Sequence, residues 1–243
     1  MKKKISSWIK QRVSEAGAKG CVFGLSGGVD SAVVAALCKM AFPKNVLGLL
    51  MPCHSNPQDA IDAQKTADKF SIPTKTIDLC KAFDDLFHQL EGTAYDGTKM
   101  DLAIANLKPR LRMLTLYYYA NQNNYLVIGT GNRSETVMGY CTKYGDAGVD
   151  LLPLASFLKT QVREMAKELG VPQEIIDKPP SAGLWAGQTD EAEMGITYEM
   201  LDKIIIGLES NKLTGLDPAK VELVKRKRGA SEHKRCLPPS FML

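Results

Sequence analysis

A chain of 243 residues is long enough to bury a complete hydrophobic core, as one large domain or as a domain with an appendage. Its 44% hydrophobic and 24% charged residues are typical of a globular protein, and the formal net charge of +4 suits an anionic ligand without proving one. No run of about 18 apolar residues is present, which excludes an ordinary membrane-spanning helix, and the basic start has no apolar stretch of signal-peptide length.

The first half of the chain alternates between predicted helices and strands. One face of an N-terminal amphipathic helix, within residues 1–19, is marked by Ile5, Trp8, Ile9 and Val13. Short apolar runs typical of buried strands are found at 21–25, 45–52, 73–78 and 125–130. Helices are predicted between them at 30–41, 57–70 and 81–90, the second with Asn56 as its N-cap. This alternation favours a doubly wound, Rossmann-like α/β fold, with a mostly parallel sheet and helices on both faces.

A long helical stretch separates the third and fourth strands, in KMDLAIANLKPRLRMLTLYYYANQ (99–122). Because Pro109 does not continue a helix cleanly, we expect two helices that meet near Lys108. The second helix is apolar nearly all round, which is typical either of a buried helix or of one shared with a second subunit. An interface in a homodimer is the interpretation that we favour.

After residue 150 the pattern becomes mostly helical, with helices predicted at 158–169, from Pro172 onward, at 197–209 and from Asp217-Pro218. No linker, internal repeat or low-complexity segment is visible. We therefore expect a single domain over 1–243, in which residues 1–19 are the N-terminal helix, 20–170 the α/β core, and 171–243 a helical extension with substrate loops.

The cysteines and histidines do not form a metal-binding pattern. No two of the six cysteines have CxxC spacing, and most lie in apolar segments, which indicates reduced, packed thiols in a cytoplasmic protein. The three histidines are scattered, and none has metal-ligand spacing from a cysteine. We therefore do not expect a zinc site.

A glycine-rich turn follows the first predicted strand, in FGLSGGVDSAVVAALC (23–38). Ser26, Gly27 and Gly28 expose successive backbone N–H groups, and the next helix directs the positive end of its dipole to the same place. Open α/β sheets bind ligands at this end of a strand, so the turn is typical of a phosphate site. It is neither a Walker A loop nor the dinucleotide-binding fingerprint. A tight turn without a ligand would account for the glycines alone.

Two carboxylates are predicted at this edge of the sheet. Asp30 follows the glycines, and Glu135 follows the fourth strand at the same end. Mg²⁺ is typically held by one or two carboxylates together with substrate phosphates, so a carboxylate beside a phosphate site indicates magnesium. Either residue could instead be a charge at the start of a helix.

The hexapeptide SGGVDS resembles the pyrophosphate-binding loop of the N-type ATP pyrophosphatases, which split ATP between its α and β phosphates to adenylate a substrate. The stretch VIGTGNRSETVMGYCTKYGDAGVDLLPLASFLKTQVREMAKELG (127–170) resembles the NAD synthetases within that group. So do NLKPRLRM before it, and KPPSAGLWAGQTDEAEMGITYEMLD and SEHKR after it. The resemblance runs from about Gly20 to Arg235. It implies amidation of deamido-NAD with ammonia and ATP, giving NAD, AMP and pyrophosphate through an acyl adenylate.

The resemblance also implies roles for individual residues. Those it assigns to ATP binding are Gly24, Leu25, Ser26, Gly27, Gly28, Val29, Asp30, Ser31, Thr130, Lys159 and Ser181. It makes Asp30 and Glu135 the Mg²⁺ ligands, and Lys159 a catalytic group that neutralises charge on the departing pyrophosphate. Those it assigns to deamido-NAD binding, in a site built across a homodimer, are Arg110, Lys143, Asp150, His233 and Lys234.

The residues alone leave ordinary alternatives open. Lys159 would be interpreted as a solvated helix charge, and Asp150 as a cap on nearby backbone. His233 and Lys234 would be part of a solvated basic tail. Lys143 lies in a polar, glycine-rich segment that is more typical of a ligand-binding loop than of a core.

The sequence also leaves two rival functions open. One is another N-type ATP pyrophosphatase, either a tRNA-modifying enzyme or a different amidating ligase, and its one supporting feature is the basic run KRKR at 225–228. The other is a non-catalytic ATP-binding sensor, which the presence of both Asp30 and Glu135 argues against. No nucleic-acid or membrane partner is expected. Because the synthetase-like region leaves about twenty residues before it and few after Arg235, we expect ammonia rather than glutamine to be the nitrogen donor.

Overall fold

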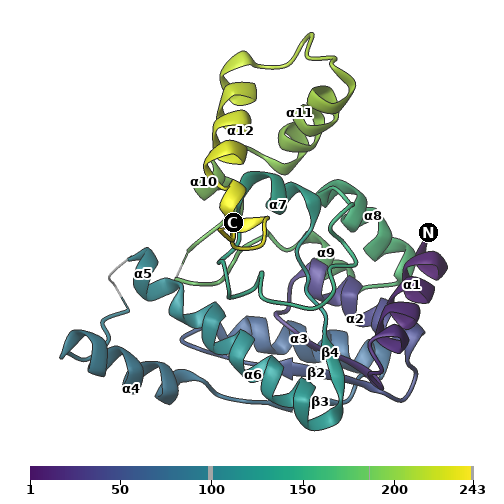
Figure 1. The fold of residues 1–243 in the computed structure, drawn as a ribbon, viewed down its shortest axis with the longest axis vertical. Coiled ribbons are helices and arrows are strands. Elements are labelled where there is room, and N and C mark those ends of the chain that lie inside the picture. The colour runs from purple at the N-terminus through teal and green to yellow at the C-terminus, as the bar shows by residue number, and fades with distance from the viewer. Residues whose placement is uncertain (98–100, 186, 242–243) are drawn as a thin grey trace.

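A parallel sheet forms the centre of the computed structural model, which describes residues 1–97, 101–185 and 187–241 (Figure 1). Within these residues the sheet has the strand order β3-β2-β1-β4. The strands are β1 (Gly20–Gly24), β2 (Val46–Leu50), β3 (Thr74–Thr76) and β4 (Tyr125–Val127). Val22 pairs with Leu47 on one side and with Val127 on the other. The chain winds outward from β1 in both directions, which confirms the doubly wound α/β prediction and places the switch point between β1 and β4.

Successive residues of β1 point into two different hydrophobic clusters. Cys21 and Phe23 pack on one face of the sheet, whereas Val22 packs on the other. The first face is covered by α1 (Lys2–Glu15), α2 (Val29–Ala41), α3 (Pro57–Phe70), α8 (Lys159–Leu169) and α9 (Gln173–Asp177). The second is covered by α4 (Cys80–Glu91), α5 (Leu102–Ala105) and α6 (Leu107–Asn123). Both faces are therefore buried, as the apolar strands require.

A helical lobe stands away from the sheet beyond α7 (Figure 1). Beyond α7 (Arg133–Met138), its helices are α10 (Asp190–Met194), α11 (Tyr198–Ser210) and α12 (Pro218–Ala230), followed by a 3₁₀ turn at Glu232–Lys234. Tyr198, Leu201 and Ile204 of α11 pack with Val224 and Met138 in a third hydrophobic cluster. Through Met138, this cluster anchors the lobe to the helix that follows β4. A single domain over 1–243 stays a prediction.

Local signals located most helix boundaries. Asn56 caps α3 by accepting a hydrogen bond from the backbone of Gln58 at 3.0 Å, as predicted. The two helices expected near Lys108 are present, but they meet at Asn106, so Pro109 lies in the first turn of α6, where its missing N–H costs little. Lys99 and Met100, the first two residues of that predicted stretch, lie outside the described residues. The short helix α10 was not predicted.

The outer face of α6 remains apolar and accessible in the single chain. Leu116 is buried against the sheet, whereas Leu114 and Tyr118 are 64% and 62% exposed. The helix is therefore only partly core, and the homodimer interface expected there stays a prediction. In the described part of the chain, no helix is both long enough and apolar enough to cross a membrane.

Candidate active site

The glycine-rich turn between β1 and α2 is held by its own serines. The Ser26 hydroxyl lies 3.1 Å from the Ser31 hydroxyl, and the backbone N–H of Gly28 donates to Ser26 Oγ at 3.3 Å. Gly27 adopts a φ of +77°, and a Cβ added there would lie 2.4 Å from the backbone oxygen of Asp59. Only glycine fits such a position, so the neighbouring helix α3 fixes the shape of the turn. The turn opens at the N-terminus of α2, a helix of 13 residues, where an anion is favoured.

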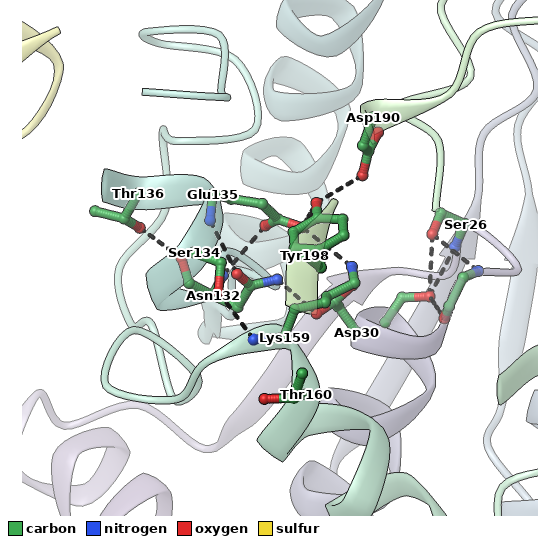
Figure 2. A network of polar contacts seen from close by, with 12 residues as sticks. Ser26, Asp30, Asn132, Ser134, Glu135, Thr136, Lys159, Thr160, Asp190 and Tyr198 are labelled. Carbon is green, nitrogen blue, oxygen red and sulfur yellow. Dashed lines mark hydrogen bonds and ion pairs between the residues drawn. The ribbon is translucent and has the colours of Figure 1, made fainter. Parts of the chain in front are cut away.

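Beside this turn, one lysine joins the two predicted carboxylates. The Lys159 ammonium donates a hydrogen bond to Asp30 Oδ2, and another of 3.2 Å to Glu135 Oε1 (Figure 2). The side chains of Lys159, Asp30 and Glu135 are 3%, 15% and 18% exposed. They come from three different helices, α8, α2 and α7. We call these three residues the Lys159 cluster.

A capping box positions the two acids of this cluster. Asn132 is the N-cap of α7, where its side chain accepts a hydrogen bond from the Glu135 backbone at 3.0 Å. Its amide nitrogen donates to Asp30 Oδ1 at 2.9 Å (Figure 2). Asn132 is fully buried and therefore ties the start of α7 to the start of α2 across the switch point of the sheet.

Asp202 of α11 positions Lys159 from behind. Its carboxylate accepts a 2.5 Å hydrogen bond from the Ser134 hydroxyl and a 3.0 Å hydrogen bond from the Thr160 backbone. Ser134 in turn accepts a 2.9 Å hydrogen bond from the Lys159 backbone. Asp202 thus links the first turns of α7 and α8, and the ends that carry Glu135 and Lys159 are held together.

Two further side chains reach the site from the helical lobe, and the sequence did not predict either. The Tyr198 hydroxyl donates to Asp190 Oδ2 at 2.8 Å and lies 3.5 Å from Glu135 Oε1. The Lys159 ammonium lies 5.0 Å from the centre of the Tyr198 ring. The sequence signal for these residues is weak, because a Thr-Asp-Glu at a helix start and a tyrosine in an apolar helix both have ordinary local roles.

Burial acts on the pKa values of Glu135, Asp190 and Lys159. It raises the pKa of Glu135 to about 7 despite the lowering influence of Lys159, and Asp30 and Asp190 add to the rise. Burial also raises the pKa of Asp190, against the hydrogen bond from Tyr198 and the charge of Lys159. For Lys159, burial opposes the charge, but Asp30 and Glu135 outweigh it, so its pKa lies above the usual value. The site is charged, buried and short of positive charge.

Comparison with known proteins places this arrangement in a family. The family model described as NAD synthase matches residues 1–238. The chain belongs to the NAD synthase family. It is 48% identical over 240 residues to the NH(3)-dependent NAD(+) synthetase of Syntrophomonas wolfei, an alignment that covers 98% of this chain and 94% of that protein. This chain thus spans nearly the whole length of that relative.

Solved structures of the NAD synthase family share the fold. The NMN synthetase of Francisella tularensis superposes with a TM-score of 0.88 at 37% identity, over 99% of this chain and 97% of that one. The NH3-dependent NAD synthetase of Campylobacter jejuni, solved with a nitrate ion, gives a TM-score of 0.84 at 31% identity over the same shares of the two chains. The family resemblance inferred from the sequence is thereby confirmed.

The remaining ATP residues expected from the family motifs are Thr130 and Ser181, and the loop of Ser181 shares a neighbour with the glycine-rich turn. Thr130 is half-buried just beyond β4. Ser181 lies in an exposed loop, where its hydroxyl accepts a hydrogen bond from the Gly183 backbone at 3.1 Å. A Cβ on Gly183 would lie 3.6 Å from Asp59 Oδ2, and Asp59 is also the residue that contacts Gly27. Asp59 is therefore a common neighbour of the loop of Ser181 and the glycine-rich turn.

Four of the five residues assigned to the dinucleotide form a second group. Arg110 donates to the Lys143 backbone oxygen at 3.4 Å, and the Lys143 ammonium donates to the His233 backbone oxygen at 2.7 Å. The Lys234 ammonium donates to the backbone oxygens of Gly139 and Cys141 at 2.8 and 2.7 Å. These contacts join α6, the loop after α7 and the C-terminal 3₁₀ turn.

Asp150 has local partners instead. One of its oxygens accepts a hydrogen bond from the Val127 backbone at 2.8 Å, and the other accepts one from the Tyr117 hydroxyl at 3.0 Å. It thus caps the edge of β4, which is the alternative that the sequence left open. To bind the dinucleotide, Asp150 would use oxygens that already accept these two hydrogen bonds.

The Lys159 cluster is suited to hold a magnesium ion together with substrate phosphates, and it does not form a complete metal site from protein ligands alone. Across residues 1–97, 101–185 and 187–241, no three His, Cys, Asp or Glu side chains are grouped as metal ligands. Asp30 and Glu135 nevertheless supply two carboxylates beside a phosphate-binding turn, and Mg²⁺ is usually held by one or two carboxylates plus phosphates. The donor set and the excess negative charge both suit this ion.

Proposed function

We propose that this protein amidates deamido-NAD with ammonia and ATP, giving NAD, AMP and pyrophosphate through an acyl adenylate. The observation that carries the proposal is the meeting of Asp30, Glu135 and Lys159 beside the glycine-rich turn. The high identity to named NH(3)-dependent NAD(+) synthetases over nearly the full length supports it. The reaction uses ATP to activate a carboxylate, which is otherwise a poor acylating agent because its leaving group would be oxide.

Each part of the site has a task in this reaction. The backbone N–H groups of the turn and the N-terminus of α2 bind the phosphates of ATP. Lys159 neutralises negative charge as the bond between the α and β phosphates breaks and pyrophosphate leaves. The second group of residues, around Arg110 and Lys143, holds the dinucleotide so that its carboxylate lies in line with the α-phosphorus. Ammonia then displaces AMP from the acyl adenylate.

Magnesium belongs to the same proposal. Asp30 and Glu135 would hold it, and when bound it supplies positive charge that stabilises the phosphate oxygens. Asn132 orients both carboxylates, since it donates to Asp30 Oδ1 and caps the helix of Glu135. Its amide thereby fixes the spacing of the pair before any ion arrives.

We also propose that the protein acts as a homodimer in the cytoplasm. Leu114 and Tyr118 leave an apolar strip exposed on α6, the same helix that carries Arg110. The six cysteines are all free, as expected in a reducing compartment. Leu114→Arg should give monomers, which analytical ultracentrifugation would detect, because a charge would face a desolvated surface. A wild-type protein that sediments as a monomer at micromolar concentration would contradict the dimer.

The decisive experiment is a reconstitution. Purified protein with ATP, Mg²⁺, ammonium and deamido-NAD should form NAD and AMP in equal amounts, measured by chromatography. Because the Francisella tularensis relative is named an NMN synthetase, a parallel reaction replaces deamido-NAD with nicotinate mononucleotide. Faster amidation of the mononucleotide would change the assigned substrate. A third reaction with ammonia-free glutamine should give scarcely any product, and full activity there would contradict ammonia as the donor.

A further inference from the structure

The Lys159 cluster contains more negative charge than one lysine can balance. Asp30 and Glu135 contact Lys159 directly, and Asp190 adds a third carboxylate through Tyr198. With all three acids ionised, one ammonium leaves an excess of two negative charges in a buried site. A divalent cation would cancel this excess, and burying charge without such compensation is costly.

Lys159 occupies the oxygens that such a cation needs. It donates to one oxygen of Asp30 and one of Glu135, the two proposed metal ligands. An ammonium and a divalent ion cannot share the space between these oxygens, since like charges at such short distance repel strongly. Lys159 must therefore leave at least one of the two carboxylates when the metal ion binds.

Asp190 is a destination for the displaced ammonium. Asp190 is 4% exposed, and its Oδ1 has no hydrogen-bond partner in the described part of the chain, although Oδ2 accepts from Tyr198. The Tyr140 hydroxyl, which donates to Glu193 at 2.9 Å, is near enough to lower the pKa of Asp190. A buried carboxylate oxygen without a donor is unusual and costs free energy. The Tyr198 ring connects the two positions, because it contacts the Lys159 ammonium through its face and Asp190 through its hydroxyl (Figure 2).

We propose that Lys159 is an internal cation that competes with magnesium, and that Asp190 is the positioning residue that holds its ammonium once the metal ion binds. The idea rests on the metal pair of the proposed function, but not on the identity of the substrates. Without metal, Lys159 pairs with both Asp30 and Glu135. With metal, it pairs with Asp190 and keeps two N–H groups for phosphate oxygens.

The test measures Mn²⁺ binding without nucleotide, using the electron paramagnetic resonance signal of free Mn²⁺. Lys159→Met should bind Mn²⁺ at least about ten-fold more tightly than wild type, because the competing charge is gone. Asp190→Asn should weaken binding about ten-fold in the presence of Lys159, but only about two- to three-fold in the Lys159→Met background. The smaller factor is the through-space effect of a lost carboxylate, which is independent of any movement of the lysine.

A matched control is present in the same chain. Lys178 donates to Asp59 Oδ1 at 2.8 Å and to Asp62 Oδ2 at 2.7 Å, and we call these three residues the Lys178 cluster. Lys178→Met removes an equal charge from an equivalent arrangement and should leave the Mn²⁺ affinity of the Lys159 cluster within about two-fold of wild type. Equal tightening by both variants would overturn the proposal.

Other outcomes are also decisive. An unchanged or weaker affinity of Lys159→Met would refute displacement, and equal factors for Asp190→Asn in both backgrounds would refute its positioning role. If Lys159→Met is too unstable to titrate, millimolar Mg²⁺ should raise its melting temperature more than that of wild type, and the absence of this difference would refute competition. Normal Mn²⁺ results without NAD formation would contradict the proposed function and leave this inference standing.

Discussion

The Lys159 cluster and the Lys178 cluster share one arrangement, a lysine ammonium between two carboxylates, but they balance charge differently. In the Lys178 cluster the side chains of Lys178 and Asp59 are 26% and 27% exposed, whereas that of Asp62 is buried at 7%. Burial pushes the pKa of Asp62 upward there, but hydrogen bonds from Lys178 and Gln58 outweigh it, and the pKa is below its ordinary value. In the Lys159 cluster burial dominates instead, and the pKa of Glu135 is raised to about 7.

This difference indicates that the Lys178 cluster is a structural ion pair, whereas the Lys159 cluster is a site that can bind a further cation. The Lys178 cluster is complete, since its lysine donates to both carboxylates and keeps the pKa of Asp62 below its ordinary value. It supports the glycine-rich turn, because the backbone oxygen of Asp59 is the atom that a Cβ at position 27 would meet. The Lys159 cluster is not complete, since an acid remains inclined to hold its proton although a lysine is beside it. Active sites concentrate such unbalanced groups.

The largest expected effect is on turnover. Asp30→Asn and Glu135→Gln should each lower kcat/KM by a factor of about 100 to 1,000, since the loss of a metal-ligand carboxylate costs several kcal/mol of transition-state stabilisation. Asp59→Asn, the matched change in the Lys178 cluster, should lower it by less than about ten-fold. Initial rates of NAD formation measure all three variants. Comparable losses in the two clusters would remove the distinction between them.

The turn and the sheet were predictable because their signals are local. Ser26 to Asp30 lie on consecutive residues between an apolar strand and an apolar helix, and this pattern is visible without tertiary structure. Glu135 was found by the rule that parallel strands end at one edge of a sheet. Lys159 was different, because a single lysine at a helix start is usually solvated, and only the family resemblance identified it.

The supporting residues could not be predicted, since their roles come from tertiary contacts. Asn132 is recognisable as a helix cap, but its second bond goes to Asp30, which is 102 positions away in sequence. Tyr198 reaches Glu135, and links Asp190 to it, only because the helical lobe packs on α7. Periodicity describes one element at a time and contains no information about which lobe residues meet the sheet.

The second-largest effect concerns stability without metal. Lys159→Met should lower the free energy of unfolding by about 3–5 kcal/mol, as is usual when a buried pair loses one partner. Lys178→Met should lower it by about 1–2 kcal/mol, because water reaches Asp59 and the space that Lys178 would vacate, and Gln58 still donates to the buried Asp62. Urea unfolding in a chelating buffer measures both values. A greater loss for Lys178→Met would contradict the ranking of the two clusters.

Gly27→Ala tests the support that α3 gives to the turn. A left-handed conformation costs a residue with a Cβ about 1–2 kcal/mol, and the contact with the Asp59 backbone adds about 1–3 kcal/mol. We expect a loss of about 2–5 kcal/mol in the free energy of unfolding, with weaker ATP binding. Gly28→Ala is the control, because its φ is −96° and its Cβ would meet only Ser26 Oγ at 3.3 Å. Equal losses would contradict the role of Asp59.

The smallest effect is a difference in pH dependence between the clusters. The pKa of Glu135 rises from 4.5 to about 7 on folding. Between pH 4.5 and about 7, the folded state therefore keeps a proton on Glu135 that the unfolded state has released. Its contribution to stability is therefore present below pH 4.5 and is lost as the pH rises to about 7, by at most about 1.4 kcal/mol per pH unit. For Asp62, whose pKa is lowered from 3.8, the sign is opposite, and stability is lost as the pH falls below that value. Urea unfolding of wild type, Glu135→Gln and Asp62→Asn in chelating buffers gives both slopes. A wild-type slope that survives in Glu135→Gln would assign the titration to another group.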